Sequence, residues 1–141
     1  NSSAASDVYK RQGRRESYKY PPIPRMSNTY ILEGDLKMDE MIKDTKKGIY
    51  VNRLGGGEVN TVTGEFLFEV KDGKMIENGK LTYPVRDATL MGVGHEALRN
   101  IDAVGCELEF EPGTCGKEEQ GVPVTDAIPG IRIKKLLVGS K

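Results

Sequence analysis

The chain has 141 residues, 37% of them hydrophobic, and its 21 lysines and arginines equal its 21 aspartates and glutamates in number. This balance lacks the basic excess that favours nucleic acid or an anionic membrane surface, so we expect neither as a partner. The sequence has no run of about 18 apolar residues and no secretion signal, so we expect no membrane span and a cytoplasmic protein.

The N-terminal segment, residues 1–12, has neither apolar periodicity nor a capping or turn pattern. It looks like the translated adapter peptide found at the ends of assembled environmental reads, so we predict a non-native, disordered tail. We assign residues 13–141 to the domain itself. The low hydrophobic content and the 17 glycines of the chain predict a thin core, so we expect a fragment that relies on the remainder of a longer protein.

The domain opens with a basic and then proline-rich segment, residues 13–25. Pro21, Pro22 and Pro24 exclude a regular helix and favour an extended backbone. The sequence therefore predicts an arm that runs along the surface.

The clearest helical pattern covers residues 35–47. Asp35 is a suitable N-cap, Met41 and Ile42 supply an apolar face, and Gly48 is a typical stop. We predict a short amphipathic helix here.

Residues 48–84 have strand character and are interrupted by glycines. Two Asx-Gly pairs follow one another in this segment, Asp72 with Gly73 and Asn78 with Gly79. Both central positions of a type I′ turn need positive φ, which Asx and Gly adopt at low cost. The segment predicts a meander of antiparallel strands with a hairpin turn at each pair.

The C-terminal third predicts one helix, two strands and a long loop. The helix begins near Gly94 within residues 90–101, and the strands cover residues 106–110 and 131–138. Between the strands, residues 112–130 contain three prolines and predict an irregular loop. The expected fold class is α+β, mostly antiparallel, with a barrel-like or curled sheet and two short helices.

Two features suggest familiar sites but favour structural roles. His95 is followed by Glu96, yet no second histidine follows at helical spacing, so one imidazole makes no zinc site. Gly55, Gly56 and Gly57 precede a strand, whereas a phosphate-binding loop needs a helix N-terminus and usually a lysine. A tight bend or a close backbone approach is the simpler use of these glycines.

Cys115 is the most suggestive single position. The chain has two cysteines and no secretion signal, so a free thiol or a metal thiolate is favoured over a disulfide. Small neighbours leave the Cys115 sulfur accessible, and Lys117 favours the thiolate, although composition alone favours an incidental loop cysteine. A cysteine protease fits poorly because its only histidine partner is His95. Cys106 lies in a strand-like segment, so we expect it to be a small buried residue.

Several longer motifs together resemble the C-terminal domain of the TldD/PmbA metalloproteases, also called the modulator of DNA gyrase family. The similarity extends from Gly13 to about Gly139. The motifs occur in the family's order and spacing at residues 13–18 (GRRESY), 24–30 (PRMSNTY), 48–50 (GIY), 55–57 (GGG), 76–80 (IENGK) and 114–118 (TCGKE).

The resemblance implies a zinc peptidase whose metal is held by a His-Glu-x-x-x-His segment elsewhere and by a cysteine of this domain. The matching cysteine is Cys115, which indicates the TldD branch. Two imidazoles and a thiolate leave a fourth position for a water molecule. This chain lacks the histidine segment, so we expect no catalytic residue in it and no activity from it alone.

The resemblance further implies that unfolded peptides are degraded or trimmed inside a dimer of two TldD/PmbA-type subunits, alike or unlike. Strand addition suits such peptides because backbone hydrogen bonds accept almost any sequence. We predict substrate contacts at residues beside the strands and the ligand, namely Gly55, Gly56, Gly57, Thr114 and Gly116.

Two other functions remain open at this point. The chain could belong to a metal-free partner subunit that only holds peptide. Alternatively, it could be an independent β-rich interaction module that binds partners through its strand edges.

Overall fold

The computed structural model describes residues 13–140, so the predicted tail at residues 1–12 lies outside the described residues. The chain divides into two compact units. Within the described residues, the first comprises residues 13–33 and 108–129, and the second comprises 34–107 and 130–140. Two long strands, β8 (Ile101–Lys117) and β9 (Gln120–Ile133), each contribute to both units.

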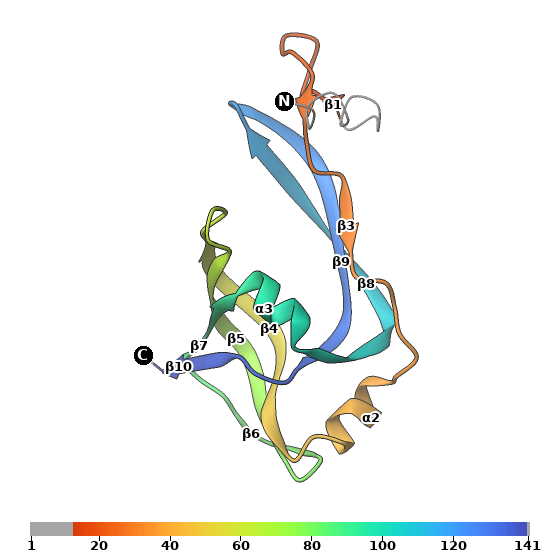
Figure 1. Cartoon of the computed structure of the whole chain (residues 1–141), viewed down its shortest axis with the longest axis vertical. Helices are drawn as coiled ribbons and strands as arrows, with labels where there is room; N and C mark the ends of the chain where they lie inside the picture. The colour runs from red at the N-terminus through yellow and green to blue at the C-terminus, as the bar shows by residue number, and fades with distance from the viewer. Residues whose placement is uncertain (1–12, 141) are drawn as a thin grey trace. The chain divides into compact units, whose positions relative to one another are not determined.

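The first unit is built on the hairpin of β8 and β9 (Figure 1). These strands are neighbours in a three-stranded sheet, and the short strand β3 (Asn28–Tyr30) pairs with β9 in parallel. Glu118 and Glu119 form the connecting turn with φ of 51° and 60°, the pattern of a type I′ turn.

The prediction of an irregular loop at residues 112–130 is therefore wrong. Proline removes a donor from the ladder, so it is expected mainly where one strand edge needs no partner. β8 lies at the edge of its sheet, and β3 pairs with β9 only from Thr125 to Ala127. Pro123 and Pro129 fall outside that doubly paired stretch, which makes them compatible with a strand.

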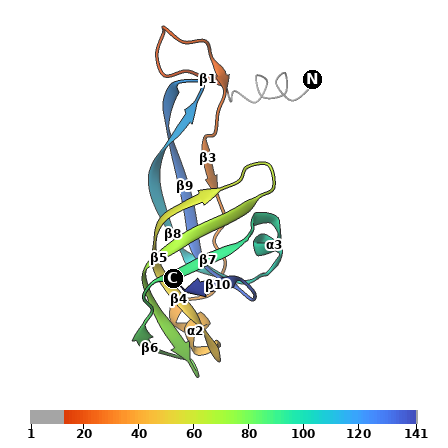
Figure 2. The same cartoon turned by 90° about the vertical axis from the view of Figure 1, so that its left-hand side faces the viewer.

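The arm of the first unit is extended, as predicted. It starts at β1 (Gly13–Arg14) and returns at β2 (Ile23–Pro24), and these two strands pair antiparallel. Both views show the arm at the turn end of the β8–β9 hairpin (Figures 1 and 2).

The second unit contains a five-stranded antiparallel sheet with the order β10-β7-β5-β4, and β6 also pairs with β5. The buried apolar side chains of this unit are Met41, Val70, Ile76, Ala88 and Ala103. The strands are β4 (Lys47–Val59), β5 (Glu65–Glu77), β6 (Lys80–Pro84), β7 (Ala88–Val93) and β10 (Leu137–Ser140), and the helices are α2 (Met38–Lys43) and α3 (Gly94–Arg99).

One of the two predicted Asx-Gly turns is confirmed. Asn78 and Gly79 connect β5 to β6 with φ of 50° and 77°. Asp72 and Gly73 instead lie inside β5, where the register with β4 shifts and the Asn52 amide donates a 2.8 Å hydrogen bond to the Asp72 carboxylate. The strand continues through the pair because Gly73 allows a close backbone approach: a Cβ there would lie 2.9 Å from the Tyr50 carbonyl oxygen.

Both predicted helices exist, and the first is shorter than predicted. α2 begins after Lys37, not at Asp35, and the Glu40 carboxylate accepts a 3.0 Å hydrogen bond from the Lys37 backbone N–H. α3 begins at Gly94 as predicted. In the described part of the chain, neither helix exceeds six residues, and none has the length and apolar character needed to cross a membrane.

The predicted fold class is confirmed as α+β with mostly antiparallel strands and two short helices. Among the described strands, the sheets stay open and do not close into a barrel.

Candidate functional site

Cys115 lies on β8, three residues before the Glu118–Glu119 turn. Its thiol is free and half-buried, whereas Thr114 and Gly116 on either side are exposed. Successive residues of a strand point to opposite faces, so Cys115 turns away from the face that these two neighbours share. Cys115, which the sequence placed in an irregular loop, thus lies in a regular strand.

Arg25, from the end of the arm, meets the hairpin at Cys115. Its residue exposure is 5%, and its Nη2 donates hydrogen bonds to the Cys115 carbonyl and, at 2.9 Å, to the Gln120 carbonyl. Within residues 13–140, Arg25 Nε and Nη1 have no hydrogen-bond partner. No local pattern indicated a role for Arg25, although the residue belongs to the 24–30 motif.

The Cys115 thiol has a lowered pKa. The Arg25 guanidinium beside it is the largest cause, and the backbone N–H of Met26 also favours the thiolate. Lys117 lowers the same pKa least of these groups, and its Nζ donates to the Pro24 carbonyl at 3.1 Å. Lys117 was the cation expected from the sequence to favour the thiolate, whereas Arg25 has the larger effect.

A buried glutamine completes the attachment of the arm to the hairpin. Gln120 is 3% exposed, and its amide donates to the Pro21 carbonyl at 3.2 Å. Its Oε1 accepts from the Glu16 backbone N–H at 3.3 Å, and the Glu16 carboxylate accepts from the Gly121 N–H at 2.7 Å. The two polar atoms of the buried Gln120 side chain are thereby both hydrogen-bonded.

The predicted glycine contacts belong to the other unit. Gly55, Gly56 and Gly57 lie in β4 of the second unit, whereas Thr114, Cys115 and Gly116 lie in β8 of the first. The β4–β5 register shifts at these glycines. A Cβ on Gly57 would collide with the carbonyl of Leu67, so the close approach proposed for these glycines is confirmed at this position.

His95 and Cys106 both belong to the second unit. His95 is exposed in the first turn of α3. Cys106 is exposed, so the prediction of a buried residue is wrong. Strand alternation explains this result, because Ala103 and Gly105 on β8 are the buried positions and Cys106 follows them on the other face.

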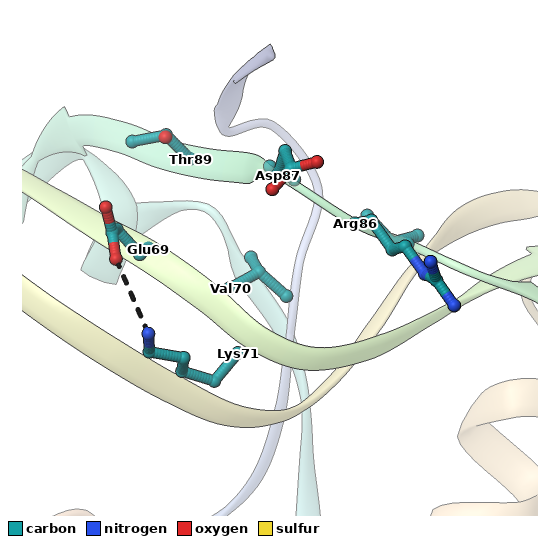
Figure 3. A pocket seen from close by; sticks show the side chains of 8 residues that line it. Glu69, Val70, Lys71, Arg86, Asp87 and Thr89 are labelled. Atoms are coloured by element: carbon teal, nitrogen blue, oxygen red, sulfur yellow. Dashed lines mark ion pairs between the residues drawn. The ribbon is translucent and has the colours of Figure 1, made fainter. Parts of the chain in front are cut away.

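A shallow hollow in the second unit contains none of the predicted site residues (Figure 3). Lys71 and Glu69 of β5 form a 3.9 Å ion pair at its rim. Arg86 and Asp87 come from the segment between β6 and β7, and Thr89 comes from β7. The charged groups of this hollow are solvated, and a solvated ion pair such as Lys71–Glu69 contributes little to the free energy of folding.

This domain offers few grouped side chains that could bind a metal ion. Among residues 13–140, no three histidine, cysteine, aspartate or glutamate side chains are grouped so that they could hold a metal ion. Cys115 fits a metal as a single donor, because it combines partial exposure with a lowered thiol pKa.

Comparison with known sequences decides the family. The profile of the PmbA/TldA metallopeptidase C-terminal domain matches residues 3–140. The chain belongs to this metallopeptidase family. The TldD/PmbA resemblance seen in the sequence motifs is thereby confirmed.

Relatives of this PmbA/TldA domain include named proteases. A metalloprotease TldD homologue of Haemophilus influenzae is 45% identical over 129 residues, which are 90% of this chain and 27% of the relative. A zinc metalloprotease TldD homologue of Saccharolobus solfataricus is 32% identical over 126 residues, 89% of this chain and 28% of the relative. The chain therefore spans about a quarter of the length of these relatives.

A solved structure shares the PmbA/TldA domain fold. TldE from Thermococcus kodakarensis has a TM-score of 0.75 over 92% of this chain and 27% of that chain, with 18% sequence identity. At this identity the likeness concerns the fold alone.

Proposed function

We propose that the chain is the C-terminal domain of a zinc-dependent metallopeptidase and that Cys115 is one ligand of the metal. The main support for this proposal is the half-buried Cys115 thiol, which lies beside the buried Arg25 guanidinium in a PmbA/TldA metallopeptidase domain. The name of the Saccharolobus solfataricus relative supports zinc. Thiolate sulfur is a ligand that zinc favours.

The domain's own residues provide the ligand and its support, and the remaining ligands come from another segment. The single histidine of the chain, His95, is exposed on α3. Two imidazoles of a His-Glu-x-x-x-His segment would complete the set and leave one open position. When bound, zinc in such a site lowers the pKa of a water molecule for attack on a peptide carbonyl.

The proposed substrate is an unfolded peptide, and the proposed partner is a second TldD/PmbA-type subunit. The similarity to TldE supports a partner of the same family. Substrate contacts at Gly55, Gly56, Gly57, Thr114 and Gly116 stay predictions, as does the cytoplasmic location.

Replacement of one atom tests the ligand. In the complete protein, Cys115→Ser is expected to abolish zinc retention and peptidase activity together, because the metal loses its thiolate. Zinc is measured by metal analysis after dialysis, and activity is measured on an unfolded peptide. Cys106→Ala and His95→Gln are the matched controls, and both should retain zinc and turnover. Full activity of Cys115→Ser excludes the proposed site.

One alternative function, implied by the family resemblance, is a metal-free subunit that only holds peptide. The two functions differ in the complete gene, because the metal-free subunit lacks the His-Glu-x-x-x-His segment. A β-rich interaction module is the remaining alternative. Cooperative folding of residues 13–141 as a monomer, without metal or partner, would support that module.

A further inference from the structure

Arg25, at the end of the arm, is a buried cation. Its exposure is 5%, and within residues 13–140 no carboxylate forms an ion pair with it. Two of its three guanidinium nitrogens have no hydrogen-bond partner in the same range. A buried cation with partial hydrogen bonding costs free energy, so a role in local structure or function is expected for it.

Nη2, the guanidinium nitrogen of Arg25 that does form hydrogen bonds, connects the two strands on either side of the turn. Arg25 Nη2 donates both to the Cys115 carbonyl on β8 and to the Gln120 carbonyl on β9. The carbonyl on β8 belongs to Cys115 itself. This hydrogen bond therefore acts on the peptide group next to the Cα–Cβ bond that carries the sulfur.

Arg14 provides an internal comparison. It also joins the arm to the hairpin, because its Nη1 donates to the Met26 carbonyl at 2.8 Å and its Nη2 donates to the Pro123 carbonyl. None of its hydrogen bonds reaches Cys115. Arg14 thus attaches the arm without a hydrogen bond to Cys115, whereas Arg25 donates directly to the Cys115 carbonyl.

We propose that Arg25 is a positioning residue for the metal ligand and that it holds Cys115 in place through the backbone of β8 and β9. This inference rests on the proposed function, in which Cys115 binds zinc. Residues that orient a metal ligand without touching the metal typically contribute about 10- to 100-fold to metal affinity.

Zinc affinity and the cobalt spectrum of the complete protein test the inference. Zinc affinity is measured by competition with a chromophoric chelator, and cobalt substitution reports the thiolate-to-cobalt charge-transfer band. Arg25→Met is expected to weaken zinc binding about 10-fold or more and to reduce that band. Arg25→Lys keeps a cation and a donor but lacks the planar fork, so an intermediate loss of affinity is expected. Arg14→Gln is the matched control, with zinc affinity within about twofold of the unchanged protein.

The outcomes separate the two claims. A protein with unaltered residues that shows no thiolate-to-cobalt band, or the same band after Cys115→Ser, contradicts the proposed ligand. A normal band that Cys115→Ser removes, together with unchanged zinc affinity in Arg25→Met, contradicts only the role of Arg25. Equal weakening by Arg14→Gln and Arg25→Met also overturns it, because arm attachment alone would then suffice. If Arg25→Met does not fold, Arg25→Lys decides, and zinc affinity equal to that of the unchanged protein overturns the inference.

Discussion

The two units of the domain are stabilised in different ways. The second unit packs apolar side chains from strands and a helix, among them Met41, Val70 and Ile76. The first unit also buries apolar side chains, Val122, Ala127 and Pro129, but polar groups join its arm to its hairpin, among them the buried Arg25 and Gln120. Apolar packing tolerates small rearrangement, whereas hydrogen bonds require defined geometry. The comparison indicates that the arm beside the candidate ligand is attached mainly by hydrogen bonds, whose geometry must be kept.

Truncation of a buried apolar side chain in the second unit should have the largest effect on stability. Ile76 is 6% exposed and lies on β5. Ile76→Ala is expected to destabilise the second unit by about 2–5 kcal/mol, because it removes buried methyl groups and leaves a cavity. Amide hydrogen exchange of the complete protein should show faster exchange on β4 and β5. Unchanged exchange there would contradict the assignment of Ile76 to the core.

Two adjacent glycines give a matched pair in the same unit. A Cβ on Gly57 would collide with the Leu67 carbonyl and the Phe68 ring, whereas a Cβ on Gly56 would meet no atom within 4 Å. Gly57→Ala is expected to cost about 1–3 kcal/mol, and Gly56→Ala should be within about 0.5 kcal/mol of neutral. Denaturant titration measures both variants. Similar losses in the two would show that the close approach at Gly57 is not the cause.

The first unit should be destabilised by the loss of a single side-chain amide. Gln120→Ala leaves the Pro21 carbonyl and the Glu16 N–H without their partners, so we expect a cost of about 1–2 kcal/mol. Exchange should increase at the arm and the hairpin turn and stay constant on β5. Equal changes in amide hydrogen exchange in both units would contradict the view that the two units are stabilised in different ways.

The turn of the hairpin can be improved. Glu118 and Glu119 both adopt positive φ, which asparagine and glycine tolerate better. The double variant Glu118→Asn with Glu119→Gly is expected to stabilise the hairpin by about 0.5–1 kcal/mol. Slower amide exchange near the turn is the measurement. Faster exchange would mean that the glutamates make contacts that outweigh their backbone strain.

The smallest effect concerns an ion pair and depends on pH. Arg132 hydrogen-bonds Asp102 at 2.9 Å and holds the pKa of that carboxyl below its usual value. A lowered folded-state pKa stabilises the protein at neutral pH, and this contribution is lost as the pH falls through that pKa. Asp102→Asn should therefore be slightly less stable than the unchanged protein at pH 7, with the difference vanishing in acid. Thermal melts between pH 2 and pH 7 check the sign, and a constant difference would refute it.

The strength of local signals explains which sequence predictions were confirmed. Asn78 with Gly79 needs only its own backbone preferences to turn, and α3 starts at Gly94 where the sequence pattern placed it. Asp72 with Gly73 shows the limit, because the same dipeptide became a bulged strand once β4 paired beside it. Neighbouring strands overrode the local turn preference there.

The sequence by itself determined the family, the fold class and Cys115 as the candidate ligand, because long motifs and local backbone preferences are recorded in residue order. Only the tertiary structure decided that Arg25 lies against Cys115, 90 positions later in the chain, and that Gln120 is buried beneath the arm. Side-chain contacts between such distant segments depend on chain folding, so no local pattern of residues specifies them.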